Sequence, residues 1–128
     1  MKKFVLLVLI LITGLTVFSQ GIEFQKGRYA EVLEMAKKQN KLVFIDIYTS
    51  WCGPCKQIAP YIEELAEEYK DTVNIGKCDV DDNADLPAQF GVRNIPTVLF
   101  IKNGEVVDKQ VGATTKAALK EKVEALLK

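Results

Sequence analysis

The sequence predicts one α/β domain in which helices flank a central mixed β-sheet on both faces. Patterns typical of strands and of helices alternate along most of the chain, which is characteristic of sheets covered by helices. One strand candidate is apolar almost throughout, as expected of a strand buried on both faces. The chain then ends with two strand patterns around a tight-turn signal and a final helix. Its 128 residues suffice for one domain but not for two.

The composition narrows the chemistry that the chain can perform. Lysine plus arginine equals aspartate plus glutamate, at 17 each, so there is no strong field that would favour nucleic acid or an acidic membrane surface. The chain contains no histidine, which excludes Ser-His and Cys-His nucleophile pairs and the usual zinc-hydrolase sites. Any catalysis must therefore use cysteine, carboxylate, lysine or tyrosine.

The first residues resemble a secretory signal. Lys2 and Lys3 precede an apolar run over residues 4–18, and small residues follow at the expected cleavage point. We predict cleavage after Ser19, giving a signal peptide over 1–19 and a domain over 20–128. The alternative is an uncleaved anchor, although spanning a membrane needs about 20 strongly apolar residues and this run is shorter and interrupted. Disulfides persist outside the cytoplasm, so in an exported protein a close cysteine pair could be a structural disulfide as well as a catalytic pair.

The elements of the first half follow from hydrophobic spacing. Residues 21–25 form a weak strand candidate, and residues 27–40 are predicted to be a helix. Residues 42–48 are apolar, β-branched and aromatic, which predicts a buried strand. The inward face of the helix is formed by Tyr29, Val32, Leu33 and Ala36.

A second helix should run from the cysteine segment to about residue 70. Pro60 falls inside this helix and is expected to kink it. The predicted inward positions are Ile58, Ile62, Leu65, Ala66 and Tyr69.

The second half predicts a strand over residues 73–80 and a short helix over 84–90. Strands over 97–101 and 105–111 are joined by Asn103-Gly104, a strong hairpin signal.

Thr115 can cap the last helix, because its hydroxyl can accept a hydrogen bond from a backbone N–H of the first turn. The predicted apolar stripe of this helix consists of Leu119, Val123, Leu126 and Leu127.

The closely spaced cysteines Cys52 and Cys55 are the strongest chemical signal. Alone, such a pair is compatible with half of a zinc site, a structural disulfide or a redox pair. Zinc requires four ligands, and the chain offers three cysteines and no histidine. A disulfide across two residues closes a very short loop and adds little stability. The redox interpretation agrees best with both considerations.

The position of the pair supports redox chemistry. It follows a buried strand and opens a helix, which places Cys52 at the helix N-terminus, where free N–H groups and the helix dipole lower the pKa of a thiol. Pro54 suits the first turn, where its missing N–H is not needed. Cys55 lies one turn further, where it can attack a mixed disulfide formed at Cys52.

The segment Trp51-Cys52-Gly53-Pro54-Cys55-Lys56 resembles the active-site motif of the thioredoxin family. Further matches occur in the same order: Asp46 six residues before Cys52, Pro60 five after Cys55, Ile95-Pro96-Thr97, Lys102-Asn103-Gly104-Glu105 and Val111-Gly112-Ala113. The resemblance extends over nearly all of the domain and implies the thioredoxin fold, a Cys52–Cys55 redox-active disulfide, and no metal or other cofactor.

Asp46 interrupts an apolar strand, where burial should raise the pKa of a carboxyl group. It could be a structural aspartate whose carboxylate oxygens form hydrogen bonds or ion pairs with neighbouring residues. The resemblance implies instead a buried acid–base group that takes the proton from Cys55. Lys77 corresponds to the family lysine that tunes this aspartate, and the alternative is a solvated strand lysine.

The resemblance also implies a substrate surface. Pro96 would be a cis-proline, and the main chain of Ile95 would pair with an extended substrate segment. Trp51 would shield the site, unless it only packs. The remaining members of this surface are Gly53 and Pro54 between the cysteines, together with Gly91 and Gly112. The alternative for Gly91 and Gly112 is that they are only turn glycines. Cys78 is expected to be an inert buried thiol, with redox regulation as the alternative.

The direction of electron flow is predicted from the residues between the cysteines. Gly53-Pro54 resembles reductants, whereas strong oxidants of the DsbA type carry Pro-His there. We therefore expect a monomeric reductase of exported, disulfide-containing proteins in the periplasm or another extracytoplasmic space, with a membrane thiol transporter as its electron donor. Tyr48, where many thioredoxins have tryptophan, and the first helix resemble exported relatives. Alternatives are an oxidase or isomerase, or a non-enzymatic interaction domain.

Overall fold

The computed structural model describes residues 29–128, which form a four-stranded sheet in the order β2-β1-β3-β4. The strands are β1 (Leu42–Tyr48), β2 (Val73–Asp79), β3 (Thr97–Lys102) and β4 (Glu105–Val111). β1 pairs with β2 in parallel, and β3 pairs antiparallel with both β1 and β4. The sheet is therefore mixed, and the predicted thioredoxin fold is confirmed.

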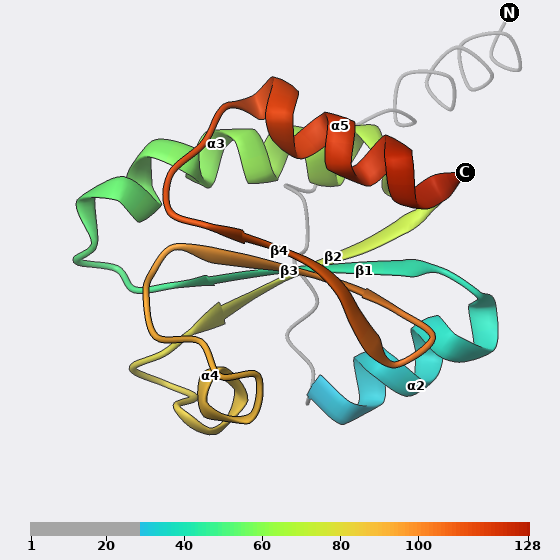
Figure 1. The fold of residues 1–128 in the computed structure, drawn as a ribbon, viewed down its shortest axis with the longest axis horizontal. Helices are drawn as coiled ribbons and strands as arrows, with labels where there is room; N and C mark the ends of the chain where they lie inside the picture. Colours follow the sequence, from blue (N-terminus) through green and yellow to red (C-terminus); the bar gives the residue numbers. More distant parts are fainter. Residues whose placement is uncertain (1–28) are drawn as a thin grey trace, which may run out of the picture.

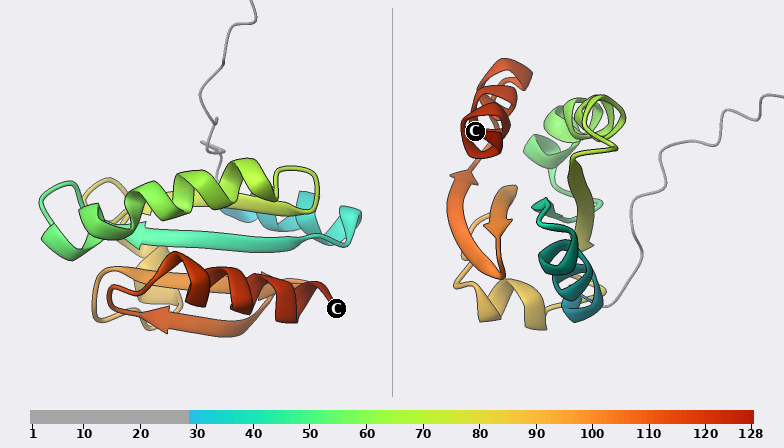
Figure 2. Two further views of the ribbon diagram at one scale, coloured as in Figure 1. Left: turned by 90° about the horizontal axis from the view of Figure 1, so that it is seen from above. Right: turned by 90° about the vertical axis from the view of Figure 1, so that its right-hand side faces the viewer.

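Helices cover both faces of this sheet (Figures 1 and 2). α3 (Gly53–Glu68) and α5 (Lys116–Leu127) lie side by side on one face, and α2 (Tyr29–Gln39) and α4 (Asp85–Gln89) lie on the other. Lys116 and Lys120 of α5 form ion pairs with Glu64 and Glu68 of α3. β1 lies inside the sheet between two helical layers, so six of its seven residues are buried.

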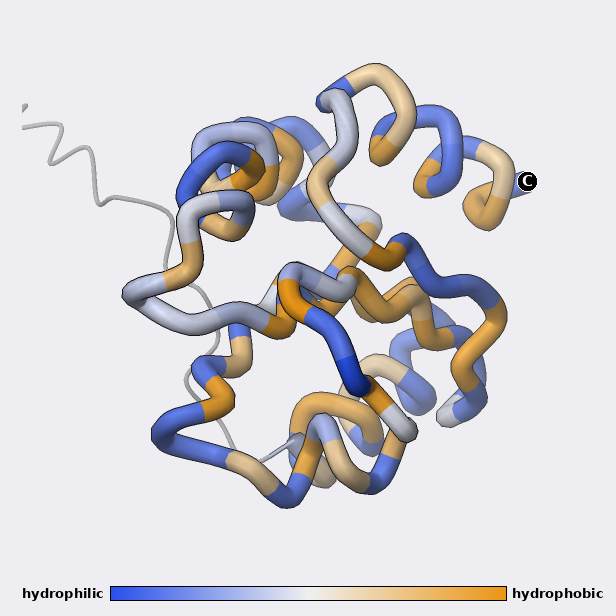
Figure 3. Tube along the Cα trace, turned by 60° about the vertical axis from the view of Figure 1, so that its left-hand side comes forward, coloured by the Kyte–Doolittle hydropathy of each residue, from blue (hydrophilic) through white to orange (hydrophobic). Residues whose placement is uncertain are grey.

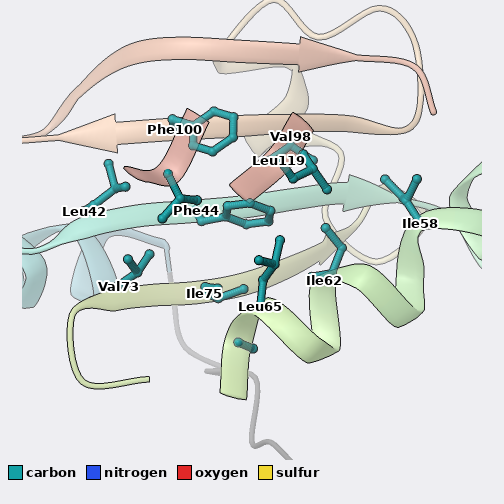
Figure 4. Packing of buried hydrophobic residues seen from close by; sticks show 12 residues of the cluster. Leu42, Phe44, Ile58, Ile62, Leu65, Val73, Ile75, Val98, Phe100 and Leu119 are labelled. Atoms are coloured by element: carbon teal, nitrogen blue, oxygen red, sulfur yellow. The ribbon is translucent and has the colours of Figure 1, made fainter. Parts of the chain in front are cut away.

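The two faces of β1 contribute to two separate hydrophobic cores, because side chains alternate along a strand. Leu42 and Phe44 pack toward α3 and α5, where the Phe44 and Phe100 rings meet edge to face at 5.2 Å (Figure 4). Val43, Ile45 and Ile47 pack toward α2 and α4. β1 is apolar almost throughout, so both of its faces can pack against helices, and this produces the layered fold.

The predicted element boundaries agree closely with the structure. The hairpin turn occurs at Asn103 and Gly104, both with positive φ (54° and 83°), as the tightest hairpin turns require. α3 continues through Pro60. Thr115 caps α5 by accepting a hydrogen bond from the N–H of Ala118 at 3.2 Å.

One predicted core position is wrong. Hydrophilic and hydrophobic residues alternate along α5 (Figure 3), and Leu119 and Val123 are fully buried. Leu127, however, is 40% exposed. It is the last residue of the helix, where the chain has passed the end of the core, so the stripe ends at Leu126.

Several sequence predictions lie outside the described residues. These are the signal peptide over 1–19, the strand over 21–25 and the start of the first helix before Tyr29. Within 29–128, no helix has the length and apolar character needed to cross a membrane.

Candidate active site

Four chain segments that carry predicted site residues meet at one end of the sheet. β1 ends there and leads into α3, and β3 begins there because it runs antiparallel to β1, with Ile47 opposite Thr97. β4 ends at the same edge, since Thr97 also pairs with Val111. Figures 1 and 2 show these loops gathered at the N-terminal end of α3. The fold therefore brings together residues that are more than 60 positions apart.

Cys52 and Cys55 form a disulfide with a Cα–Cα distance of 5.2 Å. Cys52 is the N-cap of α3, with extended φ and ψ of −77° and 115°, and its Sγ accepts a hydrogen bond from the N–H of Cys55 at 3.2 Å. Pro54 lies in the first turn, as predicted. A backbone donor that points at Sγ, together with the positive end of a 16-residue helix, favours negative charge on this sulfur.

The two cysteines differ slightly in exposure. Cys52 is 6% exposed and Cys55 is 3% exposed. Gly53 and Pro54 are exposed beside them. An incoming sulfur thus has only a narrow approach, and the residue at the helix cap is the more exposed of the pair.

Trp51 is 70% exposed, which excludes a packing role for its ring. Its indole Nε1–H donates a hydrogen bond to Oδ2 of Asp81 at 3.0 Å. Asp81 follows β2, and its own N–H donates to Oδ1 of Asp79 at 3.0 Å. The exposed ring is therefore tethered at its polar edge and presents its apolar surface next to the cysteines.

Asp46 is 1% exposed. Side chains alternate between the two faces of a strand, so Asp46 lies on the same face of β1 as Leu42 and Phe44, the face that packs against α3. Burial raises its pKa to about 6, and the positive charge of Lys77 opposes this rise. Its Oδ1 has no hydrogen-bond partner among residues 29–128. Asp46 is consequently a buried acid that can gain or lose a proton close to neutral pH.

Lys77 lies directly beside Asp46. The two are register partners on parallel neighbouring strands, so their side chains share one face. The Lys77 ammonium lies over the ring of Tyr48, 4.5 Å from the ring centroid. Lys77 is half-buried.

The segment before β3 contains two of the residues predicted to bind substrate, Ile95 and Pro96. The Ile95–Pro96 peptide bond is cis, Ile95 is half-buried, and the carbonyl of Pro96 accepts a hydrogen bond from the N–H of Gly112 at 2.8 Å. Gly91 lines a neighbouring cavity of about 180 Å³ together with Arg93 and Lys109. Gly91 and Gly112 have φ of 61° and 82°, so both also serve as turn glycines.

Cys78 is a free, buried thiol on β2. It faces the α2 and α4 side of the sheet, opposite to Asp46, and its Sγ–H donates weakly to the carbonyl of Asn83 at 3.8 Å. Burial raises the pKa of this thiol. The predicted burial of Cys78 is thus confirmed. Residues 29–128 contain no group of three His, Cys, Asp or Glu side chains that could hold a metal ion.

Two contacts of the site were not found from the sequence. Asp81 is one of several acidic residues after β2, and nothing in that pattern distinguishes the one that binds Trp51. Tyr48 attracted attention only as a departure from the usual tryptophan, whereas its contact with Lys77 depends on the pairing of β1 and β2.

Comparison with known proteins identifies the family. The thioredoxin family model matches residues 22–125. A thioredoxin of Haemophilus influenzae is 57% identical over 77 residues, which span 60% of this chain and 72% of that protein. A thioredoxin of Chlorobaculum thiosulfatiphilum is 45% identical over 99 residues, 77% of this chain and 88% of its own length.

Solved structures agree. A chain from a structure described as "Structural basis of the thiol resolving mechanism in yeast mitochondrial 1-Cys peroxiredoxin via glutathione/thioredoxin systems" superposes with a TM-score of 0.66. It is 34% identical, and the match covers 77% of this chain and 90% of that one. With this fold, this family match and a disulfide-forming Cys52–Cys55 pair, the chain belongs to the thioredoxin family of thiol–disulfide oxidoreductases.

Proposed function

We propose that this protein reduces disulfide bonds of exported proteins by dithiol–disulfide exchange. The observation that carries the proposal is the setting of Cys52: its Sγ accepts the Cys55 N–H at the N-terminus of α3. A thiolate is the attacking species in disulfide exchange, and this setting stabilises a thiolate. The Gly53-Pro54 pair between the cysteines supports the reducing direction, by its resemblance to reductants.

In the first step, the client lies extended beside Ile95, whose main chain binds it, while Trp51, Pro96, Gly91 and Gly112 border the groove. The Cys52 thiolate attacks one sulfur of the client disulfide. The client S–S bond breaks, a mixed disulfide forms at Cys52, and the other client sulfur leaves as a thiolate that takes a proton from water.

In the second step, Cys55 completes the reduction. Asp46 accepts the proton of the Cys55 thiol, because a carboxylate with a pKa of about 6 is mostly ionised at pH 7 and still basic enough to take it. The Cys55 sulfur attacks Cys52, the mixed disulfide breaks, and the second client sulfur leaves. Two electrons have passed to the client, and the Cys52–Cys55 disulfide remains.

The oxidised protein needs a dithiol donor to start again. Export through the segment over 1–19 would place the protein in an oxidising compartment, where soluble reductants are scarce. A membrane thiol transporter that carries electrons outward would supply this donor. The protein would then act as a periplasmic or extracytoplasmic monomer without another cofactor.

The test has two parts. The wild-type protein should catalyse insulin disulfide reduction with a dithiol donor, and Cys52→Ser should abolish the activity, with Cys78→Ser as the matched control that retains it. Cys55→Ser in the producing cell should accumulate mixed disulfides at Cys52 with exported clients, identifiable by mass spectrometry. Clients drawn only from the cytoplasm would contradict the exported substrate class.

The reduction potential separates a reductase from an oxidase or isomerase on the same scaffold. We expect a value near that of thioredoxin, about −270 mV. A value above about −180 mV, where disulfide isomerases lie, would contradict the reducing direction. Absence of insulin reduction by the wild type would instead favour a non-enzymatic interaction domain.

A further inference from the structure

We propose that Tyr48 is a positioning residue for the Asp46 acid–base group: its ring holds the Lys77 ammonium at the end of β1, on the face of the sheet where the Asp46 carboxyl lies. The inference deepens the proposed function and rests on it for its catalytic meaning. The position of Lys77, in contrast, can be tested without any activity.

The geometry begins with the strand register. Asp46 opposes Lys77, and Tyr48 opposes Asp79, on the parallel pair of β1 and β2. Neighbouring strands lie roughly 4.8 Å apart, so the bases of the Asp46 and Lys77 side chains are close. Tyr48 is two residues beyond Asp46, and therefore its ring leaves the same face of the sheet.

The ring has a direct contact with the lysine. The Lys77 Nζ lies 4.5 Å from the centroid of the Tyr48 ring, within the range of about 6 Å over which a ring face attracts a cation. A lysine side chain has a long, flexible stem. A fixed contact at its ammonium therefore limits how far the charge can move away from the buried carboxylate.

A nearby charge affects the pKa of Asp46 strongly because the carboxyl group is buried away from water. Desolvation raises the pKa of Asp46 to about 6, and the Lys77 charge is the influence that opposes the rise. The other titratable groups around Tyr48 and Lys77 are Cys78, Asp79 and Asp82 on the β2 side, Glu63 on α3 and Tyr29 on α2. None of these groups is a cation, so Lys77 is the positive charge in this group of side chains.

The consequence for catalysis is direct. If Lys77 is released, its time-averaged attraction for the carboxylate falls, and Asp46 keeps its proton to a higher pH. Less Asp46 is then available as a base at neutral pH, so release of the mixed disulfide by Cys55 slows there. Client binding at Ile95 and Pro96 does not involve this contact, and KM should stay unchanged.

The experiment compares Tyr48→Leu, which removes the ring, with Tyr48→Phe, which keeps it. The Asp46 carboxyl is titrated by carbon NMR in each oxidised protein. We expect the midpoint for Tyr48→Leu to lie roughly half a pH unit above that for Tyr48→Phe. In a Lys77→Met background, the two Tyr48 variants should titrate alike, because the cation is gone.

Three results would overturn the inference: equal midpoints for the two Tyr48 variants, a lower midpoint for Tyr48→Leu, or a difference that persists in the Lys77→Met background. The proposed function is judged separately with Asp46→Asn. If that substitution leaves the pH dependence of insulin reduction unchanged, Asp46 is not the base, whatever the NMR titrations show.

Discussion

At the scale of single residues, the ionised form of Asp46 is unfavourable for folding. Its pKa is about 6 in the folded protein, against 3.8 for an ordinary aspartate. A raised carboxyl pKa means that the folded state binds the proton more tightly than the unfolded state. Asp46 therefore destabilises the fold as the pH rises from about 4 to about 6, and the penalty persists at higher pH. The proposed role as the base for Cys55 accounts for the presence of such a group at the centre of the sheet.

Replacing this carboxyl should stabilise the protein in a pH-dependent way. In the oxidised protein, we expect Asp46→Asn to gain up to roughly 3 kcal/mol at pH 8 and much less at pH 4, where the native carboxyl is already protonated. Urea unfolding at the two pH values measures this. An equal gain in stability at pH 4 and pH 8 would mean that loss of the Asp46 charge does not cause the stabilisation.

Asp81 should act on client binding through Trp51. Asp81→Ala removes the acceptor of the indole N–H, a contact between exposed groups that contributes about 1 kcal/mol. We expect KM for a protein disulfide to rise roughly five-fold, with stability changed by less than about 0.5 kcal/mol. Asp82→Ala, a neighbouring exposed aspartate, is the control. If both variants behave alike, the tether has no role.

Single residues differ in how far the sequence could predict them. Cys52, Cys55 and Pro96 stand in local motifs, and Asp46 stands out as a charge in an apolar strand, so all four could be found. The Trp51–Asp81 hydrogen bond joins positions 30 apart along two separate loops. Such a contact depends on the directions of two side chains in the folded protein, which a local sequence pattern does not predict.

At the scale of elements, the sequence predicted most helices and strands because their hydrophobic patterns match their surroundings. β1 is covered on both faces and reads as continuously apolar, whereas β4 alternates between half-buried and exposed residues. The end of the α5 stripe was missed, since helical periodicity cannot show where the core stops. Leu119 and Leu127 have the same side chain and differ only in this respect.

These two leucines provide a matched pair. Leu119→Ala should destabilise the protein by about 2–5 kcal/mol, because it leaves a cavity between α5 and the sheet. Leu127→Ala should change stability by less than about 1 kcal/mol, since its side chain is already partly in water. Chemical denaturation of both variants measures the difference. Similar losses would mean that α5 does not pack as described.

At the scale of the whole molecule, the reactive residues occupy one end of the sheet, and the two cores hold that end in place from both faces. The fold class and the family follow from the sequence because several motifs occur in the right order. The proposed export depends on the predicted signal peptide over residues 1–19, which lie outside the described residues.

Export is therefore tested on the intact cell. If the first segment is a cleaved signal, the protein purified from the cell envelope or medium should begin at Gln20. Peptide mass spectrometry of the N-terminus measures this directly. A chain that retains residues 1–19 and sediments with membranes would support the uncleaved anchor instead.

The account depends most on the reactivity of one sulfur. Reduced protein carrying Cys55→Ser and Cys78→Ser has Cys52 as its single thiol, and its alkylation rate can be followed from pH 5 to pH 10. The helix N-terminus and the residue-55 N–H predict a midpoint at least one pH unit below that of a free peptide thiol, about 8.5. A midpoint at or above the free-thiol value would contradict the proposed chemistry.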